Sequence, residues 1–450
     1  MKTIQGTSRP ADDTAGTWGK VFAGAAGGCL GLALLKFGNP IVFFERIPSP
    51  TEPLQLLFDP WPLSWGYFLF AFLVALGAGL YRRPSGIPAW VLWLPAVWIG
   101  IQFVTVLTSV DPGLSLRTVA HFSSVACAFY LGAAVLGHLP DHKLFWAPIL
   151  IAFGMVLADG LYQHFYGLEE TRRYFYAYQA SHYPKGVPAE LLQKIASDRI
   201  YATLFYPNTF AGALLLLTPP LIERISRVQA TKAAKTTIIL LALATCGGCL
   251  GWSGSKAGWL IALTMVAFYL STFPMGQKAR VVLVLSLCVV GVAAFSWRYQ
   301  GYLKKGATSA SARLDYWRAG FEAFKERPFM GYGPGTFMIS YKKFKRPAAE
   351  MTRLAHNDYL QQATDSGLFA FLAFTTFVWG SLVLLYRKSL RNSGMLAVWM
   401  GIFGLSIQSA FEFHTYVPAL AWPQFLLLGW LWTWAGRERQ RPSTKAVASA

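Results

Sequence analysis

The most constraining feature of this chain is a series of twelve apolar stretches, each close to the length needed to cross the hydrocarbon core of a membrane. Because lipid offers no hydrogen bonds to the backbone, such stretches are expected to be helices. They lie near 18–37, 62–81, 88–108, 115–137, 144–165, 205–223, 236–252, 257–273, 281–297, 366–386, 394–411 and 417–435. The pattern predicts an all-α polytopic membrane protein with about twelve transmembrane helices, forming a single integral membrane domain over residues 1–450.

Composition excludes an ordinary soluble domain. Hydrophobic residues make up 54% of the chain and charged residues 14%, and the mean hydropathy is +0.39. A soluble domain of this size needs more charge to cover its surface.

The positions of lysine and arginine predict the orientation. The short loops on one side hold only Lys256, whereas those on the other side hold twelve basic residues. These are Arg82, Arg83, Lys143, Arg224, Arg227, Lys232, Lys235, Lys278, Arg280, Arg387, Lys388 and Arg391. The positive-inside rule places the basic side, and with it both termini, in the cytoplasm. Two long segments, about 166–204 and 298–365, are then expected outside the cytoplasm.

The second long segment, 298–365, is basic, with twelve Lys/Arg against six Asp/Glu. A basic outer surface suits the phosphates of lipids, lipid pyrophosphates or anionic glycans. Attraction to anionic headgroups explains the same charge without any catalytic role. Net charge alone therefore does not separate the two interpretations.

Three motifs in this segment indicate a site. His356 precedes a predicted span, where a half-buried imidazole can accept a proton near neutral pH. Arg313 and Arg318 share a predicted short helix that ends at Arg327-Pro328. The glycines of the turn that follows, at 331–335, permit close approach of the backbone to a ligand or a helix.

Further polar residues border the same side. Arg199 lies just outside the entrance of the span at Pro207-Asn208, where it is free to contact phosphate oxygens or lipid headgroups. Asp358 and Asp365 can orient His356 or cap the next span. Glu412 and His414 fall on the outer face between the last two spans, and the sequence leaves open whether they reach the site.

Taken together, these motifs resemble the O-antigen ligase and O-antigen polymerase superfamily. The similar elements are Arg199 with Pro207-Asn208, Ser253-Gly-Ser255-Lys256, Arg313 to Trp317, Arg327 to Phe337, and His356-Asn-Asp-Tyr-Leu360 followed by Gly367. The resemblance covers most of residues 60–435 and is most specific across 313–367. This family often has Ser-Arg where the chain has Ser255-Lys256, and lysine lacks the planar fork of arginine.

The resemblance implies a GT-C-type glycosyltransferase of the bacterial inner membrane, acting on the periplasmic side through its two long periplasmic loops. Its donor would be a glycan on undecaprenyl pyrophosphate, and the ligase branch transfers that glycan to lipid A–core oligosaccharide in lipopolysaccharide biosynthesis. The implied partners are this donor, this acceptor and membrane lipids. No cofactor, metal, nucleotide sugar or nucleic acid is implied.

The resemblance also suggests roles for individual residues. His356 would act as general base on the acceptor hydroxyl or orient it, and direct displacement would invert the anomeric centre. Arg199 and Arg313 would hold the pyrophosphate. The further candidates for substrate binding are Arg318, Lys256, Arg117, Asn208, Asn357 and Tyr359.

Other functions stay open at this stage. A polymerase of O-antigen or exopolysaccharide would use a second lipid-linked glycan as acceptor, and a protein O-oligosaccharyltransferase would use a protein. A transporter of lipid-linked glycans would instead need charged residues along a path within the spans. The few candidates for such a path are Arg117, His121, Asp159 and His164.

Overall fold

The computed structural model describes residues 11–183, 186–304 and 308–440. Residues 184–185 and 305–307, which belong to the two long segments, lie outside this range. All regular secondary structure in the described residues is helical, without a strand. The prediction of an all-α protein is confirmed.

A helix covers each of the twelve apolar stretches. These helices are α1 (Ala11–Lys36), α3 (Leu63–Ala78), α4 (Ala89–Val106), α5 (Pro112–Ala134), α6 (Lys143–Tyr162), α9 (Pro207–Ser226), α10 (Lys232–Ser253), α11 (Lys256–Ser271), α12 (Gln277–Arg298), α16 (Asp358–Thr375) with its continuation α17 (Ser381–Ser389), α18 (Ser393–Gln408) and α19 (Pro418–Gln440). Among the described residues, seven helices are long and apolar enough to cross a membrane, and three shorter helices are also apolar. The chain is therefore a polytopic helical protein, and the count of twelve spans stays a prediction.

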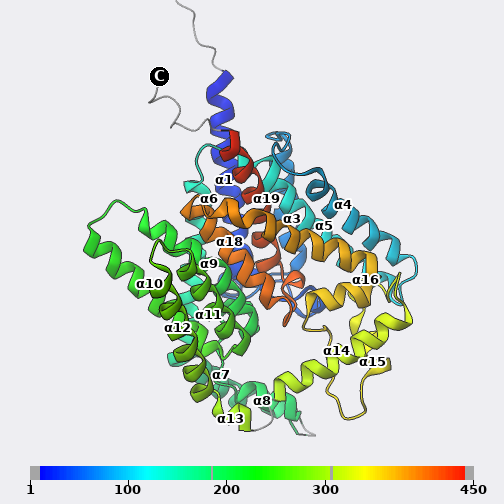
Figure 1. The fold of residues 1–450 in the computed structure, drawn as a ribbon. Coiled ribbons are helices and arrows are strands. Elements are labelled where there is room, and N and C mark those ends of the chain that lie inside the picture. The colour runs from blue at the N-terminus through cyan, green and yellow to red at the C-terminus, as the bar shows by residue number, and fades with distance from the viewer. Residues whose placement is uncertain (1–10, 184–185, 305–307, 441–450) are drawn as a thin grey trace, which may run out of the picture.

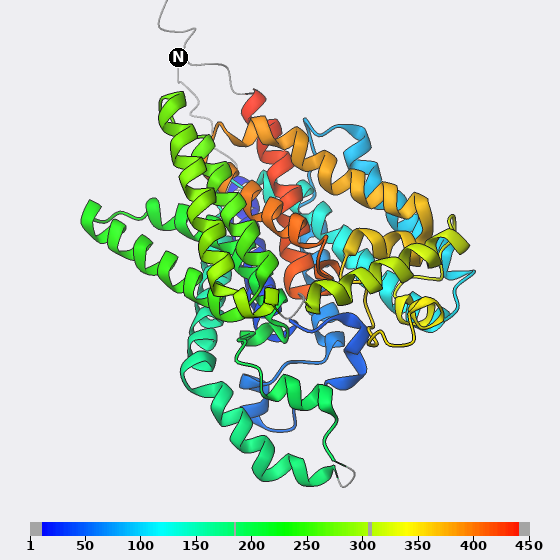
Figure 2. The ribbon, with the colours of Figure 1, turned by 60° about the horizontal axis from the view of Figure 1, so that its bottom comes forward.

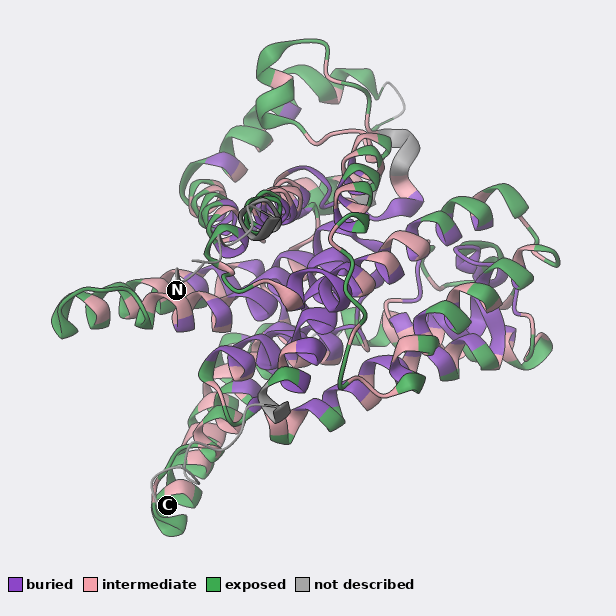
Figure 3. Ribbon diagram, turned by 90° about the horizontal axis from the view of Figure 1, so that it is seen from above, coloured by how far each residue is buried: buried purple, intermediate pink, exposed green. Residues whose placement is uncertain are grey.

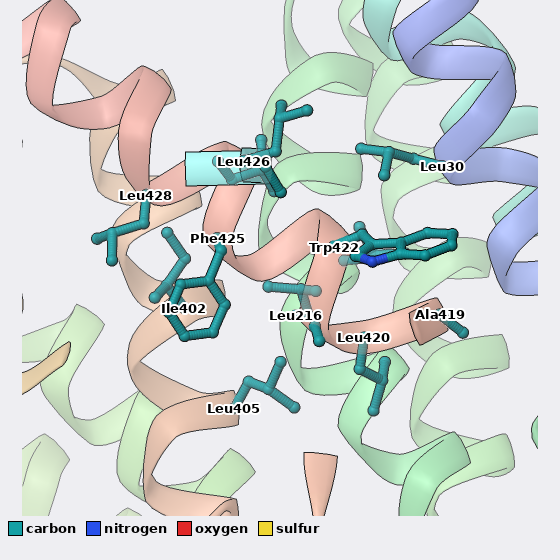
Figure 4. Packing of buried hydrophobic residues seen from close by; sticks show 14 of the residues in the cluster. Leu30, Leu216, Ile402, Leu405, Ala419, Leu420, Trp422, Phe425, Leu426 and Leu428 are labelled. Atoms are coloured by element: carbon teal, nitrogen blue, oxygen red, sulfur yellow. The ribbon is translucent and has the colours of Figure 1, made fainter. Parts of the chain in front are cut away.

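The centre of the bundle is built around α19, which packs along α5 (Figure 1). Glycines allow this close approach, because a Cβ on Gly132 would lie 1.9 Å from the carbonyl oxygen of Leu426. Large apolar side chains fill the space between α1, α9, α18 and α19, with Trp422 fully buried among them (Figure 4). This rigid centre fixes where the helix ends lie.

The outer helices expose apolar surface. Buried residues gather in the middle of the molecule, whereas exposed residues lie on the peripheral helices (Figure 3). On α12, Val289 and Val290 are 68% and 66% exposed, and no residue of this helix is buried. Side chains of this kind are suited to contact lipid.

The second long segment folds against one end of the bundle, opposite the end where α1 begins and α19 ends (Figures 1 and 2). It comprises α13 (Gln300–Lys304), α14 (Thr308–Glu326), a glycine-rich turn and α15 (Phe337–Phe344). The short helix predicted around Arg313 is therefore present and is longer than expected. We call this end of the bundle the site end.

The glycine-rich turn at 331–335 packs this segment against α16. Asp365 accepts hydrogen bonds from the backbone N–H of Gly335 and the hydroxyl of Tyr416, and its own carbonyl accepts one from Gly333 N–H at 2.7 Å. Gly333 has φ +113°, and a Cβ there would lie 1.9 Å from Ser109 Oγ. The glycines thus allow close approach to helices rather than to a ligand. α16 itself kinks at Gly367, close to the predicted start of the span.

The first long segment prolongs α6 beyond the bundle. Helical structure continues through Gln163–Gly167, α7 (Leu168–Tyr174) and Phe175–Gln179, and α8 (Ala189–Ile195) follows after a gap. Residues 198–206 then return to the site end. There Thr203 Oγ1 donates to the carbonyl of Leu34 at 2.7 Å, which brings the start of α9 beside the end of α1.

Candidate active site

A buried carboxylate, Glu412, is the centre of the polar cluster at the site end. Its side chain is 3% exposed and lies in the short loop between α18 and α19. One oxygen, Oε1, accepts hydrogen bonds from Arg313 Nη2 and Asn208 Nδ2, and the other, Oε2, lies 3.0 Å from His356 Nδ1. Glu412 therefore joins residues from α14, α9 and the loop before α16.

The His356 ring is fixed by packing as well as by Glu412. The ring stacks on Tyr316 at a centroid distance of 5.7 Å and meets Phe413 edge-on at 4.8 Å. His356 also has a left-handed backbone, with φ +48°, which is unfavourable for a residue with a Cβ. The neighbouring Asn357 caps α16 by accepting a hydrogen bond from Leu360 N–H at 3.0 Å.

Arg199 is attached to this cluster through Asn208. Its Nη2 donates to Asn208 Oδ1 at 2.8 Å, and its Nε donates to the carbonyl of Ser253 at 2.8 Å. The side chain passes directly over Gly254, where a Cβ would lie 3.0 Å from Arg199 Nε. Gly254 ends α10 with φ +63°, so both its conformation and its lack of a side chain favour glycine.

Lys256 adds a further positive charge at the start of α11. Its Nζ lies 4.1 Å from the ring centroid of Tyr302 and 5.1 Å from that of Tyr299. Burial, and then the charges of Arg199, Arg313 and Arg298, lower the pKa of Lys256. The Arg313 side chain, 19% exposed, adds a further cation, which binds Oε1 of Glu412 directly.

The electrostatics keep Glu412 ionised. Burial raises the pKa of Glu412, but the charges of His356 and Arg313 and the hydrogen bond from His356 outweigh burial and lower that pKa to about 2. Burial also lowers the pKa of Arg199, while the Glu412 charge acts in the opposite direction. An arginine remains charged at any physiological pH. One carboxylate thus faces several cations, which leaves an excess of positive charge for an anionic ligand.

Residues 241–375, which carry Lys256, Arg313 and His356, match the family model described as O-antigen ligase. The match supports membership of the O-antigen ligase family. This family consists of membrane glycosyltransferase-like enzymes, and its members imply lipid-linked glycan substrates in general. A comparison with curated proteins found no match.

The structure brings five of the residues singled out in the sequence into one cluster. His356, Arg313 and Asn208 share Glu412 as hydrogen-bond partner, and Arg199 donates to Asn208. Lys256 is near enough for the charges of Arg199 and Arg313 to lower its pKa. The matched segment 241–375 contains three of the five residues, and the segment around α9 supplies the other two. Their catalytic and binding roles remain predictions at this point.

Four other candidates lie elsewhere. Arg318 Nη2 donates to the carbonyl of Phe344 at 2.9 Å, and Tyr359 Oη donates to the carbonyl of Ser406 at 2.8 Å. Asn357 is the helix cap described above, and Arg117 lies exposed on α5. These contacts give Arg318, Asn357 and Tyr359 a part in holding the site together, and substrate binding by all four stays a prediction.

The residue that the sequence placed least clearly is Glu412. Of the carboxylates considered as partners of His356, Asp358 instead accepts a hydrogen bond from Thr415 N–H at 3.0 Å, and Asp365 holds the glycine-rich turn. The available signal for Glu412 was a lone carboxylate in a short loop between two apolar spans. Buried charges of this kind are retained only with partners.

Proposed function

We propose that this protein is an O-antigen ligase, which transfers a glycan from undecaprenyl pyrophosphate to a sugar hydroxyl of lipid A–core oligosaccharide. The observation that carries the proposal is the attachment of both His356 and Arg313 to the same buried carboxylate, Glu412. In a displacement reaction, a base can take the proton of the attacking hydroxyl, and a cation held close to it can stabilise the negative charge of the leaving group. Ligase- or polymerase-type chemistry is also what the family match supports.

The hydrogen bond to Glu412 sets the tautomer of His356. Because an ionised carboxylate only accepts hydrogen bonds, Nδ1 of His356 carries the proton and donates to Glu412 Oε2. In the neutral ring, Nε2 then has a free lone pair. Among the described residues, none hydrogen-bonds this nitrogen.

In the proposed reaction, Nε2 of His356 accepts the proton of the acceptor hydroxyl as its oxygen attacks C1 of the donor sugar. The bond between C1 and the pyrophosphate oxygen breaks, and its electron pair leaves with undecaprenyl pyrophosphate. Attack opposite the leaving group inverts the anomeric centre. A positioned base contributes about 10²–10⁴ in rate to such a step.

Arg199, Arg313 and Lys256 would neutralise the charge of the leaving pyrophosphate. Arg199 uses Nε and one Nη2 hydrogen for its bonds to Ser253 and Asn208, so the N–H groups of Nη1 are available for phosphate oxygens. Cations fixed before the reaction stabilise the developing charge without reorganisation. With the leaving group held in this way, the reaction needs no separate acid, and we expect it to proceed without a metal ion.

The proposed orientation places the site end at the periplasmic face of the inner membrane, with both termini in the cytoplasm. The support for this is the distribution of basic residues among the short loops. A cysteine introduced at exposed Ala348, in the segment between α15 and α16, should react with an impermeant maleimide added to intact spheroplasts. Labelling only after membrane disruption would overturn this orientation.

The experiment that tests the function uses the full-length chain in nanodiscs with an undecaprenyl-pyrophosphate-linked glycan and excess EDTA. We expect transfer to purified lipid A–core, with inverted configuration at the new linkage by NMR. Extension of the lipid-linked glycan without transfer to lipid A–core would assign a polymerase. Activity in neither assay would overturn the proposed chemistry.

A further inference from the structure

A cavity of about 400 Å³ opens at the site end next to the His356 cluster. It lies between the segment that links α1 to α3 and the segment that leads into α9. The residues that line it are Asn39, Phe43, Ile47, Pro48, Ser49, Pro50, Gln55, Asp59, Pro60, Phe205 and Tyr206. None of the groups assigned above to the reaction belongs to this lining.

Two aromatic rings connect the cavity to His356. Tyr206, on the cavity wall, meets Phe413 edge-on at a centroid distance of 5.6 Å, and Phe413 meets the His356 ring at 4.8 Å. Tyr206 also precedes Pro207 and Asn208, so the wall of the cavity continues directly into the cluster. A molecule that fills the cavity is therefore separated from the histidine by these two rings.

The cavity differs from the cationic cluster in its chemistry. Among the described residues that line it there is no lysine or arginine. The cations just behind the lining are already engaged, because Lys36 Nζ donates to the carbonyl of Asp59 and Arg353 Nη1 donates to that of Val42. Such a lining disfavours a pyrophosphate. The amides of Asn39 and Gln55 and the hydroxyl of Ser49 suit the hydroxyl groups of a sugar, and aromatic rings suit its apolar face.

The helix at the edge of the cavity points to a ligand held in the membrane surface. α2 (Pro53–Phe58) exposes Leu54, Leu57 and Phe58 by 67%, 63% and 74%. It lies between the end of α1 and the start of α3, where two apolar helices end. Exposed apolar side chains at this level are suited to the boundary between headgroups and acyl chains.

We propose that this cavity is the acceptor subsite, which holds one neutral sugar of a membrane-anchored glycolipid while a neighbouring sugar of the same glycolipid reaches His356. The proposal rests on the proposed transferase function and adds a separate place for the acceptor. The donor pyrophosphate occupies the cationic side of Glu412, and the acceptor sugar approaches from the side of Tyr206 and Phe413. The two substrates thus meet at the histidine from different segments of the chain.

The test is a steady-state analysis of the full-length chain in nanodiscs, with lipid A–core as acceptor. Ser49→Trp places a large side chain in the cavity, and Asn39→Ala removes one amide without adding bulk. Glu52→Trp is the matched control, because Glu52 is exposed in the same segment, lies outside the cavity lining and makes no side-chain hydrogen bond as the N-cap of α2.

We expect Ser49→Trp to raise the KM for lipid A–core about tenfold or more, and Asn39→Ala to raise it several-fold, in keeping with the loss of one hydrogen bond. The KM for the lipid-linked donor should stay unchanged in both variants, and Glu52→Trp should match the wild type. An unchanged acceptor KM in Ser49→Trp and Asn39→Ala, or an equal rise in both KM values, overturns the subsite while leaving the transferase intact. Absence of transfer by the wild-type chain would instead overturn the proposed function, and the acceptor subsite with it.

Discussion

Nδ1 of His356 lies 3.0 Å from Oε2 of Glu412, and the other oxygen of the same carboxylate binds Arg313. Three segments far apart in the sequence thus meet on one buried acid. The arrangement fixes the histidine ring by a second group, as in catalytic sites that pair a base with an orienting carboxylate. It also ties the position of the base to the position of a cation.

Replacement of Glu412 should therefore impair catalysis more than binding. In Glu412→Gln the carboxamide has only one oxygen to accept hydrogen bonds from Arg313 and His356, and it no longer fixes the tautomer of His356. We expect kcat for glycan transfer to fall by roughly 10²-fold, with a smaller change in KM for the acceptor. Glu326→Gln is a suitable control, because Glu326 lies on α14 and pairs with exposed Lys343 away from the cluster. Equal activity of Glu412→Gln and wild type would contradict an orienting role.

Arg199 should not be replaceable by lysine. A lysine keeps the charge, but it cannot bind Ser253 and Asn208 through a planar fork while also reaching a phosphate. We expect Arg199→Lys to lower kcat/KM for the lipid-linked donor by about 10- to 100-fold, as for the loss of charge-assisted hydrogen bonds. Arg346→Lys, at an exposed arginine paired with Asp315, should be unaffected. If both variants behaved alike in donor titrations, the pyrophosphate role of Arg199 would be wrong.

Gly254 provides a test of the same arginine without changing any charged group. A Cβ at this position would meet Arg199 Nε at 3.0 Å, and the backbone φ of +63° disfavours alanine by about 1–2 kcal/mol. Gly254→Ala should therefore lower the thermal unfolding midpoint and raise the donor KM. Gly251→Ala on the same helix has nothing within 4 Å of its new Cβ and should leave donor KM at the wild-type value. If Gly254→Ala left the donor KM unchanged, the proposed role of Arg199 in donor binding would be contradicted.

His414 should make the protein less stable as the pH falls. Burial lowers the pKa of His414 from 6.5 to about 4, so the folded state disfavours the charged ring more than the unfolded state does. Both states are neutral well above pH 6.5, and the destabilisation develops as the pH falls through 6.5 towards 4, reaching a few kcal/mol. We expect His414→Leu to flatten the fall of the unfolding midpoint in this range. The control His182→Leu, at an exposed histidine, should retain the wild-type slope, and a wild-type slope in His414→Leu would contradict the assignment.

Much of this arrangement could be predicted from the sequence. Hydrophobic length predicted a helix at each apolar stretch, because backbone hydrogen bonding in an apolar medium leaves few alternatives. The motifs around Arg199, Arg313 and His356 were assigned to one site by their family resemblance, and the structure does bring these residues together. The helix around Arg313 and the turn at the following glycines were also expected.

The centre of the site was harder to predict because it depends on tertiary packing. Glu412 and Asn208 are 204 residues apart, and they meet only because α9 and α18 pack side by side. No periodicity in a loop of a few residues reveals such a contact. Likewise, the sequence offered no candidate site residue in the segment from 39 to 60. Its place beside the cluster follows from the contact between Thr203 and Leu34.

The most direct test of the account is the single-turnover rate of glycan transfer by wild type and His356→Ala, using full-length protein in nanodiscs with lipid A–core and without added metal. Folding of the variant should be verified by its unfolding midpoint and by its binding of the lipid-linked donor. The account predicts that the variant binds donor normally and transfers at least about 10²-fold more slowly. Transfer by a folded His356→Ala variant at the wild-type rate would contradict the assignment of this histidine and of the site built around it.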